Sequence, residues 1–331
     1  MNGNSVRVGI VGLGKMGLLH ACILKVLPNV HLVALCDKGS LIRKVSGKIF
    51  PNAFVTDDVT KLARQNLDVV YVTTPIPSHF FIIRTIYSAN IANNVFSEKT
   101  LASDYEFSQQ LSELAQSSQG VNMVGFMKRF GVTFRKTRTL LDEGVLGDIL
   151  SFDSYAFSSD FAGVAEGRPV SGGRGGVLGD LGSHVIDLAL WYFGDLNVGS
   201  AELFPAGRTS EDSVTFDVKG SDGLTGQFDV SWCKKDFRMP EFGFTIRGTK
   251  GIISVNDDQV RLELDEKESH SWFRHDLADN VGFLVGGPEY YREDAYFVEC
   301  VMRHNVAEPS FRTASKVDFL IDQIKSEASK K

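Results

Sequence analysis

A glycine turn between an apolar strand and a helix constrains this chain more than any other feature. The run Gly12-Leu13-Gly14-Lys15-Met16-Gly17 follows the apolar stretch Val6–Val11 directly and leads into the helical periodicity of Met16–Leu27. In this context the first glycine permits a tight turn, the second lets a pyrophosphate approach the backbone, and the third lets the helix pack on the strand. The turn therefore predicts a dinucleotide site formed by Gly12, Leu13, Gly14, Lys15 and Met16.

The first 125 residues alternate β-branched runs with helical stretches. Strands are expected at Val6–Val11, His31–Cys36, Asp68–Thr73, Asn94–Ser97 and Asn122–Gly125. Helices are expected at Met16–Leu27, Leu41–Ile49, Asp57–Gln65, Ser78–Asn90 and Ser103–Ser118. Ser103 would cap the last helix, with Glu106 completing a capping box. Apolar strands separated by helices are typical of a parallel sheet buried on both faces, so residues 1–125 predict a doubly wound α/β domain that binds a dinucleotide.

The pattern changes from about residue 126. Helices are expected at Phe130–Glu143, Val177–Phe193, Glu289–His304 and Thr313–Ser329, and strands at Ile149–Phe157, Val198–Phe204, Ser213–Val218, Thr225–Trp232, Phe242–Arg247, Gly251–Val255 and Val260–Leu264. The period of two in these runs indicates an antiparallel sheet with one covered face. Residues 126–331 thus predict a second domain in which helices accompany a mostly antiparallel sheet, and the glycine- and serine-rich segment Ser158–Gly176 predicts a mobile loop.

Two further segments extend the predicted cofactor site. Asp37 lies twenty residues after Gly17 at the end of the second strand, where a carboxylate would accept hydrogen bonds from the adenosine ribose and repel a 2′-phosphate. NAD is therefore preferred, although Lys38 leaves NADP possible. Thr74 and Pro75 follow the strand at the switch point and would touch the dinucleotide, and His79 would lie toward the nicotinamide.

A lysine, an aspartate and a histidine are candidates for proton transfer. Lys99 follows a strand whose carboxyl end belongs to the same edge of the sheet, and an ammonium there can stabilise charge on a substrate oxygen. Asp180 and His184 are four residues apart on an expected helix and therefore share one face. Histidine exchanges a proton near neutral pH, so His184 is the expected acid and base. The alternative without a catalytic role is that Lys99 is a surface lysine paired with Glu98. For His184 it is a core histidine with a satisfied hydrogen-bond partner.

These motifs together resemble the Gfo/Idh/MocA family of NAD(P)-dependent sugar and polyol oxidoreductases. The resemblance rests on the glycine turn, Thr74–His79, Glu98-Lys99, Gly125–Phe130, the Asp180-x-x-x-His184-x-x-Asp187 stretch and Leu190–Gly194. It implies that His184 is the acid and base, that Lys99 bonds the reacting oxygen, and that Asp180 positions substrate. It also implies cofactor contact by Glu98 and substrate contact by Lys128 and Asp160. The fold that it implies is an N-terminal Rossmann domain followed by a substrate-binding α+β domain with a large, mostly antiparallel open sheet, through which a homodimer or homotetramer would form.

One residue departs from the family pattern. The usual Glu-Lys-Pro is Glu98-Lys99-Thr100 here. Because a cis bond before a residue other than proline costs about 2.5–4 kcal/mol, a trans peptide and a displaced Lys99 are expected.

Composition excludes several classes of protein. A net charge of −6 and a pI near 5.7 argue against nucleic-acid and membrane partners, both of which need a basic surface. The four cysteines form no CxxC pair, so no disulfide or metal site is expected, and a reducing cytoplasm is the expected location. No segment is expected to be a signal peptide or a membrane span.

The expected activity is hydride transfer between NAD(P) and a secondary alcohol or ketone of a sugar, an inositol or a sugar derivative. Two alternatives remain open from the sequence. An NAD-dependent glycosidase of the same fold would use the same residues. A non-catalytic dinucleotide-binding regulator would be expected to lack members of the Lys99, Asp180 and His184 set, all of which are present.

Overall fold

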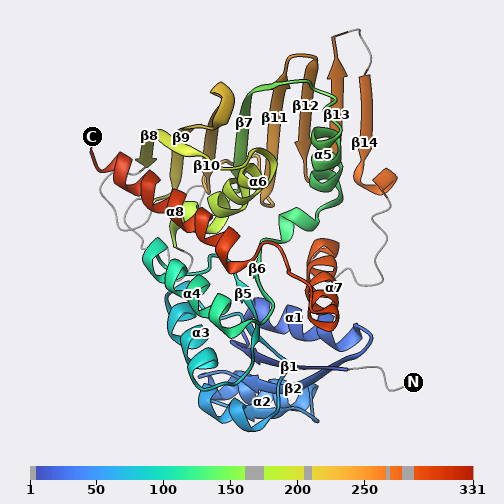
Figure 1. The fold of residues 1–331 in the computed structure, drawn as a ribbon, viewed down its shortest axis with the longest axis vertical. Helices are drawn as coiled ribbons and strands as arrows, with labels where there is room; N and C mark the ends of the chain where they lie inside the picture. The colour runs from blue at the N-terminus through green and yellow to red at the C-terminus, as the bar shows by residue number, and fades with distance from the viewer. Residues whose placement is uncertain (1–4, 161–174, 205–210, 266–268, 278–286, 331) are drawn as a thin grey trace. The chain divides into compact units, whose positions relative to one another are not determined.

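The fold is described from a computed structural model, for residues 5–160, 175–204, 211–265, 269–277 and 287–330 (Figure 1). These residues form two compact units, one within Met1–Met127 and Val281–Asp318 and the other within Lys128–Asn280 and Phe319–Lys331. Much of the predicted Ser158–Gly176 loop lies outside the described residues.

The first unit is built on a six-stranded sheet with the order β3-β2-β1-β4-β5-β6. Its strands are β1 (Val6–Val11), β2 (Val30–Cys36), β3 (Phe54–Thr56), β4 (Val69–Val72), β5 (Asn94–Glu98) and β6 (Asn122–Gly125). All neighbouring pairs are parallel. The order reverses between β1 and β4, which is the switch point at which such sheets bind ligands beyond the strand ends. The doubly wound parallel sheet is confirmed.

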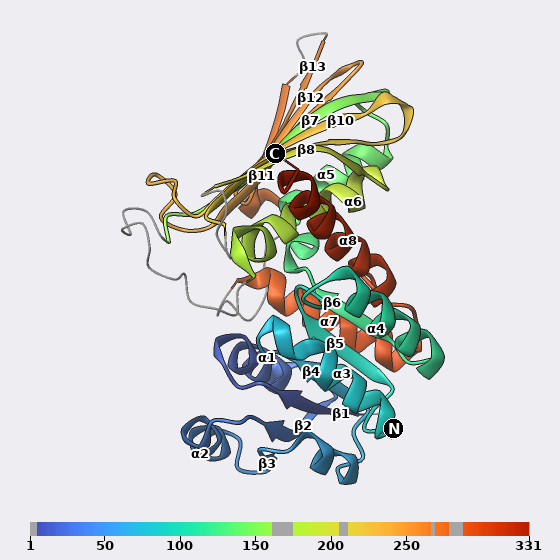
Figure 2. The same cartoon turned by 90° about the vertical axis from the view of Figure 1, so that its left-hand side faces the viewer.

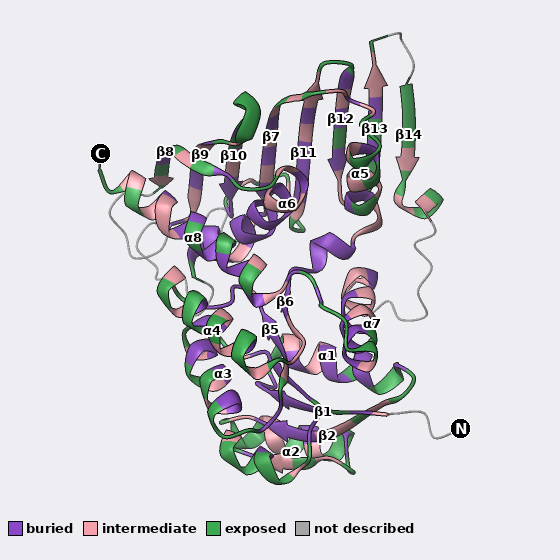
Figure 3. Ribbon diagram, viewed as in Figure 1, coloured by how far each residue is buried: buried purple, intermediate pink, exposed green. Residues whose placement is uncertain are grey.

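Helices connect these strands: α1 (Lys15–Val26), α2 (Ser40–Ile49), α3 (His79–Ser88) and α4 (Tyr105–Ser118). Every residue of β4 is buried, as expected for a strand covered on both faces (Figure 3). The predicted cap at Ser103 is wrong. Asp104 is the N-cap of α4, and its carboxylate accepts the Phe107 N–H at 3.0 Å. The predicted helix Asp57–Gln65 is present as the 3-10 helix Val59–Arg64 and not as an α-helix.

The second unit is built on an eight-stranded sheet with the order β14-β13-β12-β11-β7-β10-β9-β8. Its strands are β7 (Ile149–Phe157), β8 (Asn197–Phe204), β9 (Ser213–Lys219), β10 (Thr225–Ser231), β11 (Glu241–Gly248), β12 (Gly251–Asn256), β13 (Gln259–Leu264) and β14 (Ser269–Phe273). Among the described strands of this second sheet, only β7 and β10 pair in parallel, so the mostly antiparallel sheet is confirmed.

Helices α5 (Val132–Asp142) and α6 (Ser183–Phe193) lie on one face of this sheet (Figure 2). The strand pattern explains why. In β7 the alternate residues Phe152, Ser154 and Ala156 are buried, and Phe152 stacks on Phe193 of α6 at a ring distance of 4.5 Å. The sequence missed β14, whose five residues alternate too briefly to stand out from a loop.

The two units divide the chain differently from the predicted domains 1–125 and 126–331. Val281–Asp318 belongs to the first unit, and it contains α7 (Pro288–Arg303) and the start of α8 (Phe311–Ala328). Two contacts explain this assignment: the Val124 N–H donates to the Pro309 carbonyl at 2.9 Å, and the His20 ring of α1 bonds the Asp294 carboxylate of α7 at 2.9 Å. Such contacts join segments far apart in the sequence, so periodicity does not reveal them.

The buried carboxyl of Glu293 on α7 makes the stability of the first unit depend on pH. Burial raises its pKa well above the usual value, as it raises the pKa of the neighbouring Asp294. Between the unfolded pKa of about 4.3 and the higher native pKa, the folded state binds more protons than the unfolded state. The free energy of unfolding therefore falls as pH rises, by up to about 1.4 kcal/mol per pH unit for one group.

Replacing Glu293 with glutamine should remove the part of this pH dependence that Glu293 contributes. Glu293→Gln should be more stable than the wild type at pH 8, and this advantage should shrink toward pH 5. Hydrogen exchange of the α1 and α7 amides measures the effect, because all three tryptophans lie in the second unit. Glu299→Gln is the control, since this residue on the same helix is half exposed. Parallel pH profiles for wild type and Glu293→Gln would contradict the prediction.

Candidate active site

The turn between β1 and α1 has the three glycine roles expected of a dinucleotide site. Gly12 has a φ of 98°, and a Cβ there would lie 2.7 Å from Thr74. A Cβ on Gly17 would lie 1.8 Å from the Gly12 carbonyl oxygen, so Gly17 permits close packing of helix on strand. A Cβ on Gly14 would meet nothing within 4 Å. The open space is therefore at the second glycine, where a phosphate would approach the backbone.

A cavity of about 600 Å³ opens at this turn. Its lining includes most of the predicted cofactor residues: Gly12, Gly14, Lys15, Met16, Asp37, Lys38, Thr74 and Pro75. It also includes Ser78, where a helix that offers amides to the cofactor was expected to begin, and residues that the sequence analysis missed: Val11, Cys36, Asp57, Val59, Thr73, Phe81 and Ile82. Asp57 directly follows β3, and a strand end is a signal for a cofactor contact. It was missed because β3 has only three residues and is too short to be recognised in the sequence.

The residues at this cavity fit a dinucleotide. Gly14 is the N-cap of α1 and supplies no side-chain cap, which leaves the first N–H groups of the helix to a ligand. A helix N-terminus carries partial positive charge and binds phosphate through those N–H groups. The cavity volume also lies within the range of about 300–1,000 Å³ that small-molecule and cofactor sites occupy.

Asp37 is held in place by two backbone N–H groups. Its Oδ2 accepts from Leu13 at 2.6 Å and its Oδ1 from Gly39 at 2.7 Å. The side chain of Leu13 is fully buried and does not line the cavity, so this residue acts there through its backbone. The Arg43 guanidinium donates to the Asp37 and Lys38 carbonyls at 2.8 and 2.7 Å. Asp37 thus presents a fixed negative charge at the cavity.

Replacing Asp37 with serine should shift the preference from NAD toward NADP. The change removes the charge that repels a 2′-phosphate and leaves Lys38 in the lining. We expect the ratio of the two dissociation constants to move by about 100-fold, equivalent to about 2.8 kcal/mol. Isothermal titration with each dinucleotide measures it. Asp142→Asn, which removes an exposed charge in the second unit, is the control, and an unchanged ratio in Asp37→Ser would contradict the assignment.

His79 is fully buried and does not line the cavity. Its Nδ1 lies 2.9 Å from the Thr100 carbonyl oxygen and its Nε2 lies 2.7 Å from the Thr74 carbonyl oxygen. Burial lowers its pKa, while these carbonyls oppose that effect. His79 therefore connects the segment after β4 to the segment after β5. It does not contact the cavity itself and can affect a cofactor only indirectly, through Thr74 and Thr100.

Strand β5 ends at Glu98, and Lys99 and Thr100 come directly after it. Glu98 is 8% exposed; one carboxylate oxygen bonds the His20 ring at 3.0 Å and the other accepts the Lys99 N–H at 3.2 Å. Glu98 is absent from the cavity lining, whereas Lys99 is half-buried. The expected trans peptide is wrong: Lys99-Thr100 is cis. The expectation was based on the free-energy cost of a cis bond in isolated peptides. In the folded chain the surroundings of Thr100 differ, because this residue is buried and its carbonyl is hydrogen bonded to the His79 ring.

The second unit holds Asp180 and His184 on a helix that starts with a π turn. Leu178–Gly182 is π-helical, and α6 continues from Ser183. The two residues are therefore separated by a wider turn than the expected α-helix, of a kind often found at functional sites. Asp180 is half-buried and His184 is 4% exposed. The His184 ring meets the Phe242 ring edge to face, with centroids 5.3 Å apart.

Lys128 lies at the same aromatic ring. Its ammonium is 4.6 Å from the Phe242 centroid and bonds the Asp257 carboxylate, which also accepts the Phe242 N–H at 3.0 Å. Phe242 thus joins Lys128 and His184 within the second unit. Asp187 makes a bidentate pair with Arg129, with two bonds of 2.7 Å, so Arg129 has a structural partner. Asp160 is exposed at the end of a described segment.

Glu211 is a residue of this region that the sequence analysis missed. Its Oε1 accepts the Leu178 N–H at 2.9 Å, and its backbone carbonyl accepts the Val177 N–H at 3.1 Å. A Cβ on Gly176, whose φ is 77°, would lie 2.2 Å from the same carboxylate. Glu211 therefore fixes the start of the π turn that carries Asp180. The sequence signal was weak, because one glutamate before a strand has no distinguishing spacing.

Comparison with known proteins identifies the family. Residues 6–126 match the oxidoreductase family with an NAD-binding Rossmann fold, and residues 134–254 match the GFO/IDH/MocA C-terminal domain. The chain belongs to the GFO/IDH/MocA oxidoreductase family. The resemblance inferred from the motifs is confirmed, and the first unit is an NAD-binding Rossmann domain.

Relatives in this family include sugar and inositol dehydrogenases. D-glucoside 3-dehydrogenase of Escherichia coli is 28% identical over 233 residues, which are 69% of this chain and 62% of the relative. Myo-inositol 2-dehydrogenase of Thermotoga maritima is 25% identical over 196 residues, 57% of this chain and 55% of the relative. The chain thus spans little more than half the length of such relatives. The solved structure of levoglucosan dehydrogenase with NADH and levoglucosan has a TM-score of 0.86 at 21% identity, covering 98% of each chain, which shows the shared fold.

No helix among the described residues combines the length and the apolar character that a membrane span requires.

Proposed function

We propose that this protein transfers a hydride between NAD and a secondary alcohol or ketone of a sugar, an inositol or a sugar derivative. The observation that carries the proposal is the cavity at the β1–α1 turn, with its uncapped helix and its open space at Gly14. A cavity of this kind in a family of oxidoreductases supports redox chemistry, and the dehydrogenase relatives support an alcohol as substrate. The first unit would bind cofactor and the second would bind substrate.

The proposed mechanism assigns one task to each of three side chains. His184 takes the hydroxyl proton as the alcohol is oxidised and returns it in the reverse reaction. The Lys99 ammonium donates a hydrogen bond to the reacting oxygen and stabilises its charge. Asp180 accepts a hydrogen bond from a neighbouring hydroxyl and orients the substrate, with Lys128 and Asp160 as further contacts. NAD, when bound, supplies the carbon that accepts or donates the hydride.

A substrate panel tests the proposal. Polyols, inositols, free sugars and nucleotide sugars are incubated with the protein and NAD, and separately with NADP, while NADH or NADPH formation and thermal shift are recorded. We expect at least one polyol or sugar to give reduced cofactor. Cleavage of an aryl glycoside without net NADH would favour a glycosidase, and NAD binding without turnover of any substrate would favour a regulator.

We also propose that copies of this chain assemble through the face of the eight-stranded sheet opposite α5 and α6. Residues of β7 that alternate with the buried ones, Asp153, Tyr155 and Phe157, lie on that face and are half-buried, and Tyr155 stacks on Phe157 with centroids 5.0 Å apart. Light scattering on a sizing column should give a multiple of 36.4 kDa, and a monomer mass would contradict assembly. The cytoplasm is the proposed location, in keeping with four free cysteines.

A further inference from the structure

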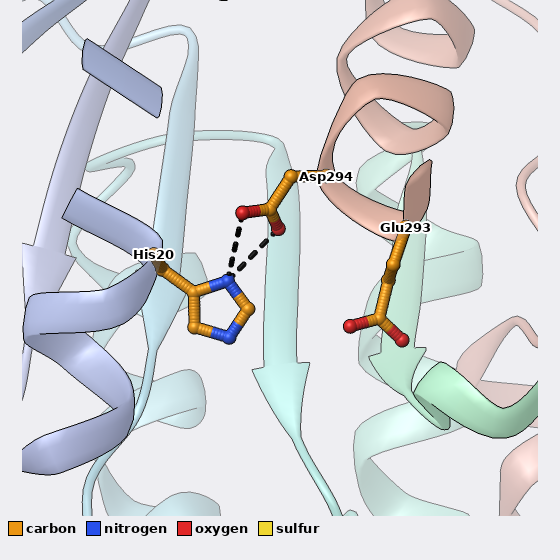
Figure 4. Close-up of side chains that lie close together, drawn as sticks. All are labelled: His20, Glu293 and Asp294. Atoms are coloured by element: carbon orange, nitrogen blue, oxygen red, sulfur yellow. Dashed lines mark hydrogen bonds and ion pairs between the residues drawn. The ribbon is translucent and has the colours of Figure 1, made fainter. Parts of the chain in front are cut away.

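A buried set of ionisable side chains lies in the first unit outside the cavity. It comprises His20 on α1, Glu98 at the end of β5, and Glu293 and Asp294 on α7. Figure 4 shows His20, Glu293 and Asp294. His20, Glu293 and Asp294 are 0% exposed. Ionisable groups are rarely buried to this extent unless they are paired, so the arrangement of their protons needs an explanation.

The His20 ring is held between two carboxylates. Its Nε2 lies 3.0 Å from Glu98 Oε1, and its Nδ1 lies 2.9 Å from both oxygens of Asp294. An ionised carboxylate only accepts hydrogen bonds, so both ring nitrogens must donate and the imidazole carries two protons. Burial alone would lower the pKa of His20, but Asp294 and Glu98 together raise it well above the usual value.

His20, Glu293 and Asp294 also offer ligand atoms that lie within 4.8 Å of one another, as in a metal site. In the described positions both Asp294 oxygens lie 2.9 Å from Nδ1, which is a hydrogen-bond distance, so the carboxylate contacts the ring directly. The described positions are those of a hydrogen-bonded network.

Aromatic rings enclose this network. The His20 ring lies 5.1 Å from Phe96, 5.6 Å from Tyr71 and 6.2 Å from Tyr290, measured between centroids. Tyr71 and Phe96 stack on each other at 4.5 Å. Because these rings surround the imidazole with apolar surface, the hydrogen bonds to the two carboxylates are stronger than they would be in water. His20 is therefore a rigid link between α7 and the end of β5.

The link reaches Lys99 through Glu98. The Glu98 oxygen that does not bond His20 accepts the Lys99 N–H at 3.2 Å. On the other side of Lys99, the Thr100 carbonyl lies 2.9 Å from the His79 ring. We propose that His20 is a positioning residue for Lys99, holding the Glu98 carboxylate in the place from which it fixes the Lys99 backbone. This inference rests on the proposed function, in which Lys99 bonds the reacting oxygen.

The protons of the network also give the proposal a pH dependence. The ionisable groups that face His20 are Glu98 from β5, Tyr71 from β4, and Tyr290, Glu293 and Asp294 from α7. Neither carboxyl oxygen of Glu293 has a hydrogen-bond partner among the described residues, and burial raises its pKa. A protonated Glu293 leaves Glu98 and Asp294 as the two charges that the doubly protonated ring balances.

Two substitutions at His20 separate positioning from simple packing. The amide of His20→Gln reaches the place of Nε2 and can bond Glu98, whereas the amide of His20→Asn reaches only the place of Nδ1 and can bond Asp294. Each is assayed with NAD and the sugar or polyol that the wild type oxidises fastest. We expect kcat to stay within about fivefold in His20→Gln and to fall about 100-fold in His20→Asn, the cost of a misplaced group. The dissociation constant for NAD should stay within about threefold in both.

A readout independent of turnover accompanies these assays. The acetylation rate of the Lys99 amine by acetic anhydride, measured by peptide mass spectrometry, should change in His20→Asn and not in His20→Gln. Equal losses of kcat and equal labelling rates in the two variants would overturn the proposal, because a packing role does not distinguish which carboxylate is held.

A double-substitution cycle separates this inference from the proposed function. Adding His20→Asn to Lys99→Ala should lower kcat by less than about threefold, because the residue that His20 positions is already gone. If Lys99→Ala alone kept near-normal turnover, the proposed role of Lys99 would fail. If Lys99→Ala were inactive and His20→Asn still added its full loss, only the positioning role would fail.

A milder variant covers the case in which the His20 variants do not fold. Asp294→Asn keeps the volume and an acceptor oxygen but removes the charge that favours the doubly protonated ring. The doubly protonated ring is the form that holds both carboxylates, so the proposal predicts that kcat declines at alkaline pH as His20 loses its second proton. In Asp294→Asn this loss should occur at lower pH, so the decline of kcat should begin at lower pH than in the wild type. Identical pH profiles of kcat would overturn the proposal.

Discussion

Replacing His184 with alanine is expected to lower kcat by about 1,000-fold, within the range of 10²–10⁴ that general acid and base catalysis contributes. The variant has no side chain that takes up the hydroxyl proton, so the alcohol must release it to water. Affinity for NAD should stay within a few-fold, because every residue that lines the cofactor cavity belongs to the first unit. Stopped-flow measurement of NADH formation gives kcat, and calorimetry gives the affinity.

Two controls distinguish chemistry from packing in this experiment. His184 is almost fully buried against Phe242, so the melting temperature of the variant is recorded beside its kcat. Added imidazole should restore part of the activity if a missing ring is the cause. His275→Ala removes an exposed histidine and should change neither quantity. Turnover above a tenth of the wild-type value in His184→Ala would rule out the assigned role.

Replacing Gly14 with valine is expected to weaken NAD binding by about 100-fold while leaving the fold intact. The φ of Gly14 is −68°, which residues other than glycine adopt, and a Cβ there meets nothing within 4 Å of the free protein. It would occupy the space beside the N–H groups of α1, where the pyrophosphate would lie. Loss of one or two charge-assisted hydrogen bonds, each about 1.5–3 kcal/mol, accounts for the expected change in affinity.

A graded series makes this prediction sharper. Gly14→Ala, with a smaller side chain, should lose about tenfold in affinity, or about 1.4 kcal/mol. Gly47→Ala on α2 is the control, because a Cβ there makes an ordinary contact of 3.6 Å with Val55 away from the cavity. Calorimetry measures affinity, and thermal unfolding checks that stability is unchanged. Wild-type affinity in Gly14→Val would show that the pyrophosphate does not approach this glycine.

Local patterns predicted the first sheet and its cofactor turn because the physics there is local. A strand buried on both faces must be apolar throughout, and a turn that admits phosphate needs glycine at fixed places. Asp37 was found in the same way, since a carboxylate at the end of the second strand has a defined partner. The cavity lining agrees with most of these residues. Phe81 and Ile82 were missed because they line it from the first turns of α3, where no spacing rule applies.

Contacts between distant segments account for most of what the sequence left undetermined. The amphipathic pattern of α7 predicted a helix, but which surface it covers depends on His20, far away in the chain. The peptide bond before Thr100 was predicted from isolated-peptide energetics, whereas the folded chain places Thr100 in a buried environment. The cap of α4 differed by one residue because Ser103 and Asp104 are both good caps, and the charged one is used.

The place of α7 has a consequence for how the chain is synthesised. Residues 1–127 contain all six strands of the first sheet and Glu98, but Asp294, the second carboxylate that pairs with His20, is 274 positions away from it. A nascent chain that has emerged from the ribosome only as far as residue 127 would expose the His20 imidazole and the Glu98 carboxylate to water, whereas the complete protein buries both. Folding of the cofactor-binding half is therefore completed only after nearly the whole second unit has been translated. A truncated version for isolated expression would need α7 grafted back onto it.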